Sequence, residues 1–193
     1  MHISLAGRLG SGKSTLAKIF CPKYGFEHYY TGAIMRALAE ERGMSALEFN
    51  QMCEGDRSAD YMIDNKTTEV SRERKDDKIL FDSRMAWHFA AKSFKIFLTI
   101  EPCEAARRVM LNQRGCEEFY ADEKEACDKL IERSQVEQAR FMQIYGVDYY
   151  DFNNFDLIVD TTRRTPEEIL DIIMAAYNAY VTDEASYTRQ IHD

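Results

Sequence analysis

The sequence predicts a three-layer α/β/α fold in which a five-stranded parallel sheet is covered by helices on both faces. Short apolar runs alternate with longer segments that carry helix signals, and this pattern favours a parallel sheet. The chain has 193 residues, 45% of them hydrophobic, enough for one well-buried core. A glycine-rich turn directly after the first apolar run agrees with this class of fold. We therefore expect one domain with insertions.

The expected strands are short apolar runs, and the first of them leads into the glycine-rich turn. A helix from Ser14 to Tyr24, closed by Gly25, follows that turn. The five expected strands are residues 2–6, 27–30, 78–82, 94–99 and 155–160.

Capping residues, prolines and glycines mark the boundaries of the other helices. Ser45 with Glu48 and Thr165 with Glu168 have the spacing of capping boxes, and Pro166 occupies the first helical position after the second cap. The remaining boundaries are stops at Gly43, Gly115 and Gly146, a start at Pro102, and a polar helix that opens with Asp122 and Glu125 and reaches about Tyr145.

Residues 7–14 read Gly-Arg-Leu-Gly-Ser-Gly-Lys-Ser, the complete G-x-x-x-x-G-K-[ST] pattern of a phosphate loop. Lys13 supplies a mobile positive charge, Ser14 offers a hydroxyl to Mg²⁺, and the following helix points its positive end at the anion. The alternative is a merely flexible glycine turn. The pattern predicts a P-loop NTPase fold that binds a nucleoside triphosphate, with the backbone curled at Gly7, Gly10 and Gly12.

Two helical, charged inserts do not fit the role of covering a sheet. Residues 31–75 and 115–147 are both much longer than typical connections. Two mobile flaps on such a core indicate an enzyme that closes over two substrates and excludes water. A helical spacer or an oligomer contact is the alternative.

A carboxylate and an arginine follow the third expected strand. Asp82 ends the apolar run at the carboxyl edge, where open α/β sheets bind ligands, and we expect it to hold Mg²⁺. Arg84 lies at the same rim, where a guanidinium can hold a phosphate oxygen. The alternative for Asp82 is a turn or N-cap residue before a helix over residues 84–91.

A second anion site is expected after the second strand. Thr31 and Gly32 close that strand, and Thr31 is expected to cap the helix that follows. The amide groups at this helix start and the side chain of Arg36 would then face an anion. The alternative is a capped helix with one exposed arginine.

Five arginines gather in and around the second insert of a strongly acidic chain. Arginines on a closing lid neutralise the charge that develops on a transferred phosphoryl group. Two of them, Arg133 and Arg140, are seven residues apart and can project from one helix face. The alternative is surface pairing with neighbouring carboxylates, which contributes little. The others are Arg107, Arg108 and Arg114.

The composition argues against several classes of protein, including broad nucleic-acid binders, membrane proteins and disulfide-rich exported proteins. A net charge of −8 argues against broad binding of nucleic acid or anionic membranes. No apolar run approaches 18 residues and no export signal is visible, so a cytoplasmic protein is expected. The five scattered cysteines are expected to be free thiols, without a disulfide framework or a zinc site: Cys21, Cys53, Cys103, Cys116 and Cys127.

The ordered set of segments resembles the nucleoside monophosphate kinases, and most closely the short cytidylate kinases typical of archaea and some bacteria. The resemblance runs from Met1 to about Tyr180. It rests on Gly7–Thr15, Tyr30-Thr31-Gly32 with Arg36, Arg42-Gly43-Met44-Ser45-Ala46-Leu47-Glu48-Phe49, Asp82-Ser83-Arg84, Arg133 to Arg140, Ile144-Tyr145-Gly146-Val147-Asp148 and Phe155-Asp156-Leu157-Ile158-Val159-Asp160-Thr161.

The resemblance implies the reaction ATP + (d)CMP giving ADP + (d)CDP, with Mg²⁺. It implies small-molecule nucleotide substrates, a monomer or weak homo-oligomer, and a core of residues 1–30, 76–114 and 148–181. An NMP-binding insert (31–75), a LID insert (115–147) and a tail (182–193) complete this division. The residues that would hold ATP are Gly10, Ser11, Gly12, Lys13, Ser14, Thr15 and Arg108. The monophosphate would be held by Thr31, Gly32, Arg36 and Arg84, and Mg²⁺ by Ser14 and Asp82. Arg133 and Arg140 would act from the lid.

Some residues depart from the family pattern. Asp82 stands where the family usually has Glu, and Arg8-Leu9 stand where it usually has a proline pair. Ser83 replaces a glycine beside the phosphate-binding arginine. Two other functions therefore stay open: a kinase of another small acceptor, such as AMP, another nucleoside monophosphate or a shikimate-like acid, and a non-catalytic nucleotide-sensing regulator.

Overall fold

The computed structural model describes residues 1–45, 48–49, 52, 58–111 and 120–193. Several residues singled out in the sequence lie outside this part of the chain. They are Ala46, Leu47, Cys53, Arg114, Gly115 with its expected helix stop, and Cys116.

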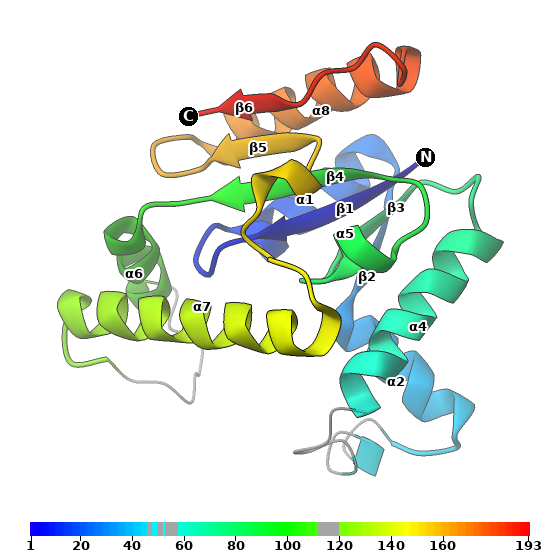
Figure 1. The fold of residues 1–193 in the computed structure, drawn as a ribbon, viewed down its shortest axis with the longest axis horizontal. Coiled ribbons are helices and arrows are strands. Elements are labelled where there is room, and N and C mark those ends of the chain that lie inside the picture. The colour runs from blue at the N-terminus through cyan, green and yellow to red at the C-terminus, as the bar shows by residue number, and fades with distance from the viewer. Residues whose placement is uncertain (46–47, 50–51, 53–57, 112–119) are drawn as a thin grey trace. The chain divides into compact units, whose positions relative to one another are not determined.

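The strands form a six-stranded sheet in the order β2-β3-β1-β4-β5-β6 (Figure 1). β1 pairs with β3, β3 with β2 and β5 with β6, each in parallel. The predicted α/β fold with a parallel sheet is confirmed. The strands are β1 (His2–Gly7), β2 (Glu27–Tyr30), β3 (Ile79–Asp82), β4 (Ser93–Thr99), β5 (Leu157–Asp160) and β6 (Gln190–His192).

The expected number of five strands is wrong by one, because β6 lies in the C-terminal tail. Its three residues are too few to show an alternating pattern, and Ile191 in its middle is exposed. The strand forms because its backbone pairs with β5, with Ile191 opposite Ile158. The start of β5 also differs from the expected one, because Phe155 is the C-cap of a short 3-10 helix, η1 (Phe152–Asn154).

The chain divides into two compact units. The first comprises Met1–Ala6 and Ser14–Ile96, and the second comprises Gly7–Lys13 and Phe97–Asp193. Strand β4 contributes residues to both units. Residues Gly7–Lys13 of the phosphate loop and the second insert belong to the second unit, and Ser14 and the first insert belong to the first.

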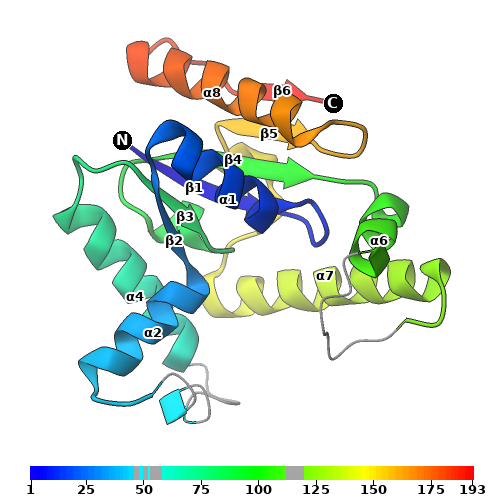
Figure 2. The same cartoon turned by 180° about the vertical axis from the view of Figure 1, so that it is seen from behind.

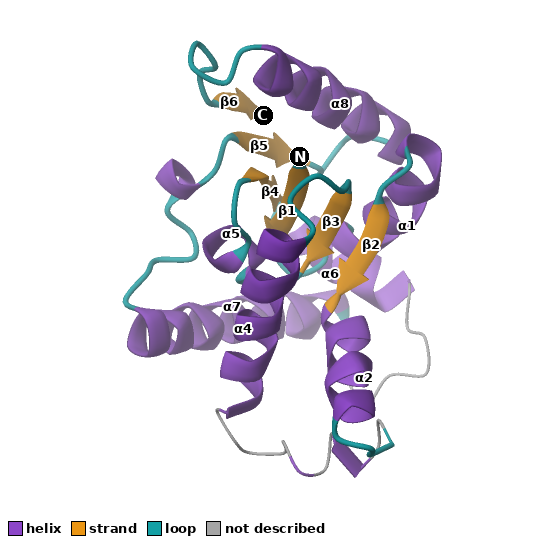
Figure 3. Cartoon of the chain, turned by 90° about the vertical axis from the view of Figure 1, so that its right-hand side faces the viewer, coloured by secondary structure: helices purple, strands orange, loops and turns teal. Residues whose placement is uncertain are grey.

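Within the described part of the insert 31–75, which belongs to the first unit, the helices α2 (Thr31–Glu41) and α4 (Ser58–Glu73) share an apolar cluster. Figure 2 and Figure 3 show α2 and α4 side by side. Ile34, Leu38 and Phe49 are buried in that cluster. A second cluster packs Val70 of α4 against Ile79, Phe81, Ala86 and Ala90. The other helices are α1 (Lys13–Tyr24), which begins at the boundary of the units, and α5 (Ala86–Phe89).

In the second unit, α6 (Pro102–Leu111) and α7 (Glu123–Tyr145) lie side by side (Figure 1). Small side chains allow this approach, because Ala105 and Ala106 pack against Ala126 and Leu130. The predicted start and stop of α7 are confirmed. Asp122 accepts a hydrogen bond from the Glu125 amide, and Gly146 ends the helix in the left-handed conformation, with φ of 68°.

The last helix, α8 (Pro166–Thr182), lies along β5 in Figure 2. Its predicted capping box is confirmed, because Thr165 Oγ1 accepts from the Glu168 amide and Glu168 accepts from the Thr165 amide. Among the described residues, no helix combines the length and apolar character that a membrane span requires.

Two helix starts differ from the expected ones. Thr31 does not cap α2, because β2 stays extended through Tyr30 and the helix begins at the next residue. The N-cap is therefore Tyr30, without a side-chain hydrogen bond. The helix expected over residues 84–91 is reduced to the single turn of α5, whose N-cap is Met85, so Arg84 lies in the preceding turn.

Candidate functional site

The phosphate loop is packed so tightly at two glycines that a side chain would not fit. A Cβ atom on Gly7 would lie 2.6 Å from Leu98 O, and one on Gly10 would lie 2.8 Å from Ala105 Cβ. Gly10 also has φ of 77°, a conformation that L-residues rarely adopt. The Arg8 amide donates to Leu98 O at 2.9 Å, which anchors the loop to β4. The sequence pattern thus produces the expected curled backbone.

Lys13 folds back over this loop. Its Nζ donates to Gly7 O at 2.9 Å and lies 3.4 Å from Arg8 O. The ammonium group is therefore held at the loop. Ser14 and Thr15, the next two residues of the helix, are exposed.

Thr161, which follows β5, packs against the loop from another strand end. Its side chain is fully buried, and Oγ1 lies 3.2 Å from Ser11 O and 3.0 Å from Thr99 O, with one proton to donate to either. Ser11 Oγ is also buried and has no hydrogen-bond partner among the described residues. Thr161 belongs to a segment that carried the family resemblance, but the sequence alone assigned it no role.

Arg108, expected to contact the triphosphate, is held beside Thr161. Its Nη2 donates to Thr161 O at 2.7 Å and to Thr162 O at 3.2 Å. Glu104 accepts from Arg107 at 2.7 Å and from Arg108 at 2.8 Å. These hydrogen bonds, led by that from Arg107, lower the pKa of the Glu104 carboxyl to about 2 despite its partial burial. Arg107 thus forms the surface pairing considered as the alternative.

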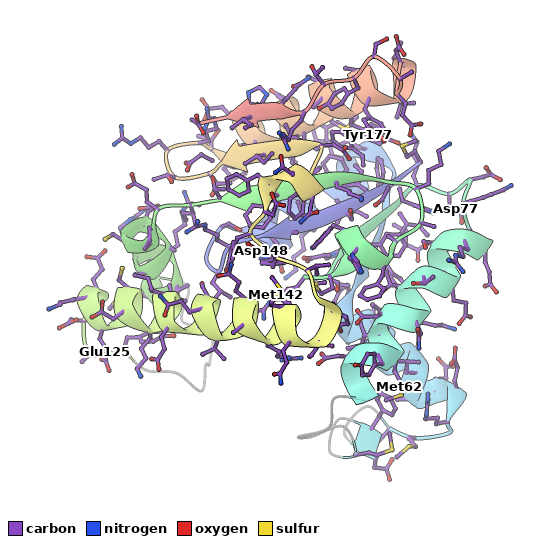
Figure 4. The ribbon with its side chains drawn as sticks, viewed as in Figure 1. Met62, Asp77, Glu125, Met142, Asp148 and Tyr177 are labelled. Atoms are coloured by element: carbon purple, nitrogen blue, oxygen red, sulfur yellow. The ribbon has the colours of Figure 1, made fainter. Side chains whose placement is uncertain are left out.

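Tyr149, a residue that the sequence analysis missed, contacts the loop directly. It is fully buried, and its hydroxyl accepts from Gly7 N at 3.0 Å and donates to Gly7 O at 3.1 Å. The two residues are 142 positions apart, so no local pattern reveals the contact. The only hint was its place directly after the Tyr145–Asp148 segment, which carried the resemblance; Asp148 is labelled in Figure 4.

The two lid arginines expected to act on the transferred group lie on α7. Arg133 and Arg140 are both exposed. The guanidinium carbon of Arg140 lies 6.0 Å from the centre of the Phe141 ring. Their roles stay predictions.

In the first unit, the carboxyl ends of β2 and β3 bring a carboxylate and an imidazole together. Asp82 is the last residue of β3 and stands opposite Tyr30 in the parallel register. It is 9% exposed, and its Oδ2 lies 3.2 Å from His28 Nε2. Burial, followed by the charge of Asp82, raises the pKa of the Cys21 thiol to about 12. Asp82 is therefore a buried strand-end carboxylate and does not cap α5.

Arg36 stacks on Tyr30 at the start of α2. Its guanidinium carbon lies 5.3 Å from the ring centre, and its Nη2 donates to the Tyr30 hydroxyl. Thr31 is exposed and Gly32 is half-buried, with the Tyr30 ring so close that a Cβ on Gly32 would lie 3.1 Å from it. Arg84, in the turn after β3, is half-buried. The residues predicted to hold the acceptor thus lie at the start of α2 and in the turn after β3, and their roles stay predictions.

The resemblance to the cytidylate kinases is tested by comparing this chain with known proteins. Residues 2–163 match the model of the cytidylate kinase-like family. The chain belongs to the cytidylate kinase-like family. The resemblance seen in the sequence is confirmed, and the matched residues include the phosphate loop, the start of α2 and the turn after β3.

Family members from archaea are similar to this cytidylate kinase-like chain over nearly its whole length. The cytidylate kinase of Haloarcula marismortui is 34% identical over 185 residues, which cover 95% of this chain and 92% of that protein. The cytidylate kinase of Pyrococcus abyssi is 34% identical over 175 residues, which cover 90% and 92%. The crystal structure of shikimate kinase from Bacteroides thetaiotaomicron shares the fold, with a TM-score of 0.64, 17% identity and coverage of 92% and 98%.

Proposed function

We propose that this protein transfers the γ-phosphoryl group of ATP to CMP or dCMP, forming ADP and CDP or dCDP. The observation that carries the proposal is the family match over residues 2–163, which includes a complete phosphate loop. Relatives that are 34% identical are cytidylate kinases by name. They favour CMP over AMP or a shikimate-like acid as the acceptor, and a catalyst over a regulator.

The loop has the properties that a triphosphate requires. Its tight packing at Gly7 and Gly10 leaves backbone in place of side chains, and Lys13 holds a positive charge at the loop. The buried Ser11 hydroxyl, which lacks a partner among the described residues, has hydrogen-bonding capacity to spare. We assign the phosphates of ATP to residues 10–15, with Arg108 beside them.

The residues proposed for Mg²⁺ supply the hard oxygen atoms that this ion prefers. They are the Ser14 hydroxyl and the Asp82 carboxylate, which terminates a buried strand. When bound, Mg²⁺ would supply positive charge that offsets the negative charge of the phosphate groups.

The acceptor is assigned to Thr31, Gly32, Arg36 and Arg84 in the first unit. The guanidinium of Arg36, which stacks on Tyr30, is planar and can donate two parallel hydrogen bonds to a phosphate. The attacking group is a phosphate oxygen that is already ionised at neutral pH, so no side chain is needed as a general base. Positioning and charge neutralisation carry the reaction.

The remaining assignments concern the two inserts and the core. Arg133 and Arg140 are proposed to stabilise the charge on the transferred group when the lid, residues 115–147, closes. Residues 31–75 are proposed to bind the nucleoside monophosphate, and residues 1–30, 76–114 and 148–181 to form the core.

A substrate panel tests this function. Purified protein with ATP and Mg²⁺ is assayed for ADP release in the presence of CMP, dCMP, UMP, AMP or shikimate. We expect CMP and dCMP to accelerate ADP release most strongly. A strict preference for AMP or shikimate would reject cytidylate as the acceptor, and ADP release that no acceptor stimulates would reject the kinase.

A further inference from the structure

A single tyrosine hydroxyl binds both backbone polar groups of Gly7, the first residue of the phosphate loop. Tyr149 Oη accepts from Gly7 N at 3.0 Å and donates to Gly7 O at 3.1 Å, inside a fully buried environment. Both polar groups of Gly7 are thereby satisfied by one side chain from the far end of the sequence. Without that hydroxyl, a buried N–H would lose its partner, which is costly.

The same glycine carbonyl connects the tyrosine to the lysine proposed to act on the phosphates. Gly7 O accepts from Tyr149 Oη and from Lys13 Nζ, the latter at 2.9 Å. Because a carbonyl oxygen has two lone pairs, both donors can bind it together. The position of Gly7 O therefore sets where the Lys13 ammonium lies, and Tyr149 sets the position of Gly7 O.

Tyr149 is in turn held by α7 and by the turn that follows it. Asp148 accepts from Gln138 Nε2 on α7 at 2.8 Å and from the Tyr150 amide at 2.9 Å. The Tyr149 ring packs against Phe141, also on α7, with centroids 5.5 Å apart. These contacts tie the tyrosine to the helix that carries the proposed lid arginines.

We infer that Tyr149 is a positioning residue for the phosphate loop and couples α7 to the donor site through Gly7. Its hydroxyl keeps the loop curled and Lys13 oriented. A displacement of α7 reaches the loop through Asp148, Phe141 and this hydroxyl. The inference rests on the proposed function for its effect on turnover, but its effect on the loop itself does not require an acceptor.

Tyr149→Phe tests the inference, because it removes only the hydroxyl and keeps the packed ring. We expect faster hydrogen exchange in the peptide that contains Gly7. We also expect a rise of about threefold to tenfold in the Kd for ATP, as for the loss of one or two hydrogen bonds. With CMP as acceptor, kcat should fall about tenfold while the KM for CMP stays within twofold.

Tyr180→Phe is the control, because Tyr180 lies on α8 and its hydroxyl donates to Glu184 at 3.1 Å and not to the loop. It should leave loop exchange and ATP affinity unchanged. Asp148→Ala approaches the same contact from the α7 side and should weaken ATP binding in the same direction, by less. The ATP affinity of Asp148→Ala also tests the inference if the Tyr149→Phe protein does not fold.

Two results would overturn the inference. One is a Tyr149→Phe protein with a lower melting temperature but unchanged ATP affinity and unchanged Gly7 exchange, which would reduce the tyrosine to a structural role. The other is an equal effect of Tyr180→Phe. Hydrogen exchange and ATP affinity are measured without an acceptor. A wild-type protein that is inactive on CMP would therefore contradict the proposed function, while these two measurements would still test the inference about Tyr149.

Discussion

At the phosphate loop, some residues contact partners that are close in the sequence, and others contact partners that are far away in the sequence. Lys13 could be predicted from the sequence because its partners lie within seven positions of it and the loop pattern is local. Tyr149 could not, since it meets Gly7 across 142 residues and only the folded chain brings the two together. Thr161 escaped prediction for the same reason, because it reaches Ser11 from another strand end.

Replacing Lys13 tests the proposed charge in the donor site. Lys13→Ala is expected to lower kcat by at least about 100-fold, because it removes a charge that stabilises the transition state. Steady-state kinetics and a melting curve are measured together. Lys18→Ala, an exposed lysine on the same helix, is the control and should behave as wild type. Near-normal turnover in Lys13→Ala would remove Lys13 from the mechanism.

A substitution of Arg36 that keeps its charge but changes its shape tests the proposed acceptor site. Arg36→Lys keeps the charge but loses the planar group that stacks on Tyr30 and can grip a phosphate with two hydrogen bonds. The KM for CMP should rise about tenfold, with the KM for ATP unchanged. Arg72→Lys, an exposed arginine on α4, serves as control. Equal shifts in both KM values would show that Arg36 does not act on the acceptor alone.

At the scale of elements, boundaries set by local hydrogen bonds could be predicted, and those set by other strands could not. The caps at Asp122 and Thr165 formed as expected, because each depends on residues three positions apart. The start of α2 was misplaced, since β2 remains paired with β3 through Tyr30. Strand β6 was missed because its pairing with β5, and not its own sequence, makes it a strand.

Gly146 ends α7 in the left-handed conformation and provides a stability prediction. Gly146→Ala is expected to destabilise the protein by about 1 kcal/mol, because a Cβ atom is strained at φ of 68°. Gly146→Asn should cost less, since Asn tolerates this conformation better. Urea unfolding of the two variants and the wild type gives the order. An alanine variant as stable as wild type would show that this cap contributes nothing to the fold.

Glu104 on α6 is expected to make the stability of the fold depend on pH. Its pKa is about 2 in the folded protein, lowered chiefly by the hydrogen bond from Arg107, and about 4.3 in an unfolded chain. A carboxyl with a depressed folded-state pKa stabilises the fold above its unfolded-state pKa and loses that contribution as the pH falls toward 2. The stability difference between wild type and Glu104→Gln should thus be constant from about pH 7 to 5 and shrink below about pH 4.3. Urea unfolding over this range measures it, and a difference that does not vary with pH would contradict the assignment.

At the scale of the whole molecule, the alternation of strands and helices was enough to predict the fold, because parallel strands require helical connections. The chain is acidic overall, with a net charge of −8, yet several of the residues proposed to bind phosphate groups are arginines. That contrast directs the search for function to local clusters and not to the total charge. Which acceptor the protein prefers could not be predicted from the spacing of residues, because selectivity depends on pocket shape.

The most direct test of the central claim follows the phosphoryl group itself. The protein is incubated with CMP, Mg²⁺ and ATP labelled in its γ-phosphoryl group, and the labelled products are separated. Transfer predicts that the label appears in CDP, in step with ADP formation, and that the Lys13→Ala protein forms almost none. Label that stays in ATP, or that is released as inorganic phosphate whether or not CMP is present, would contradict it.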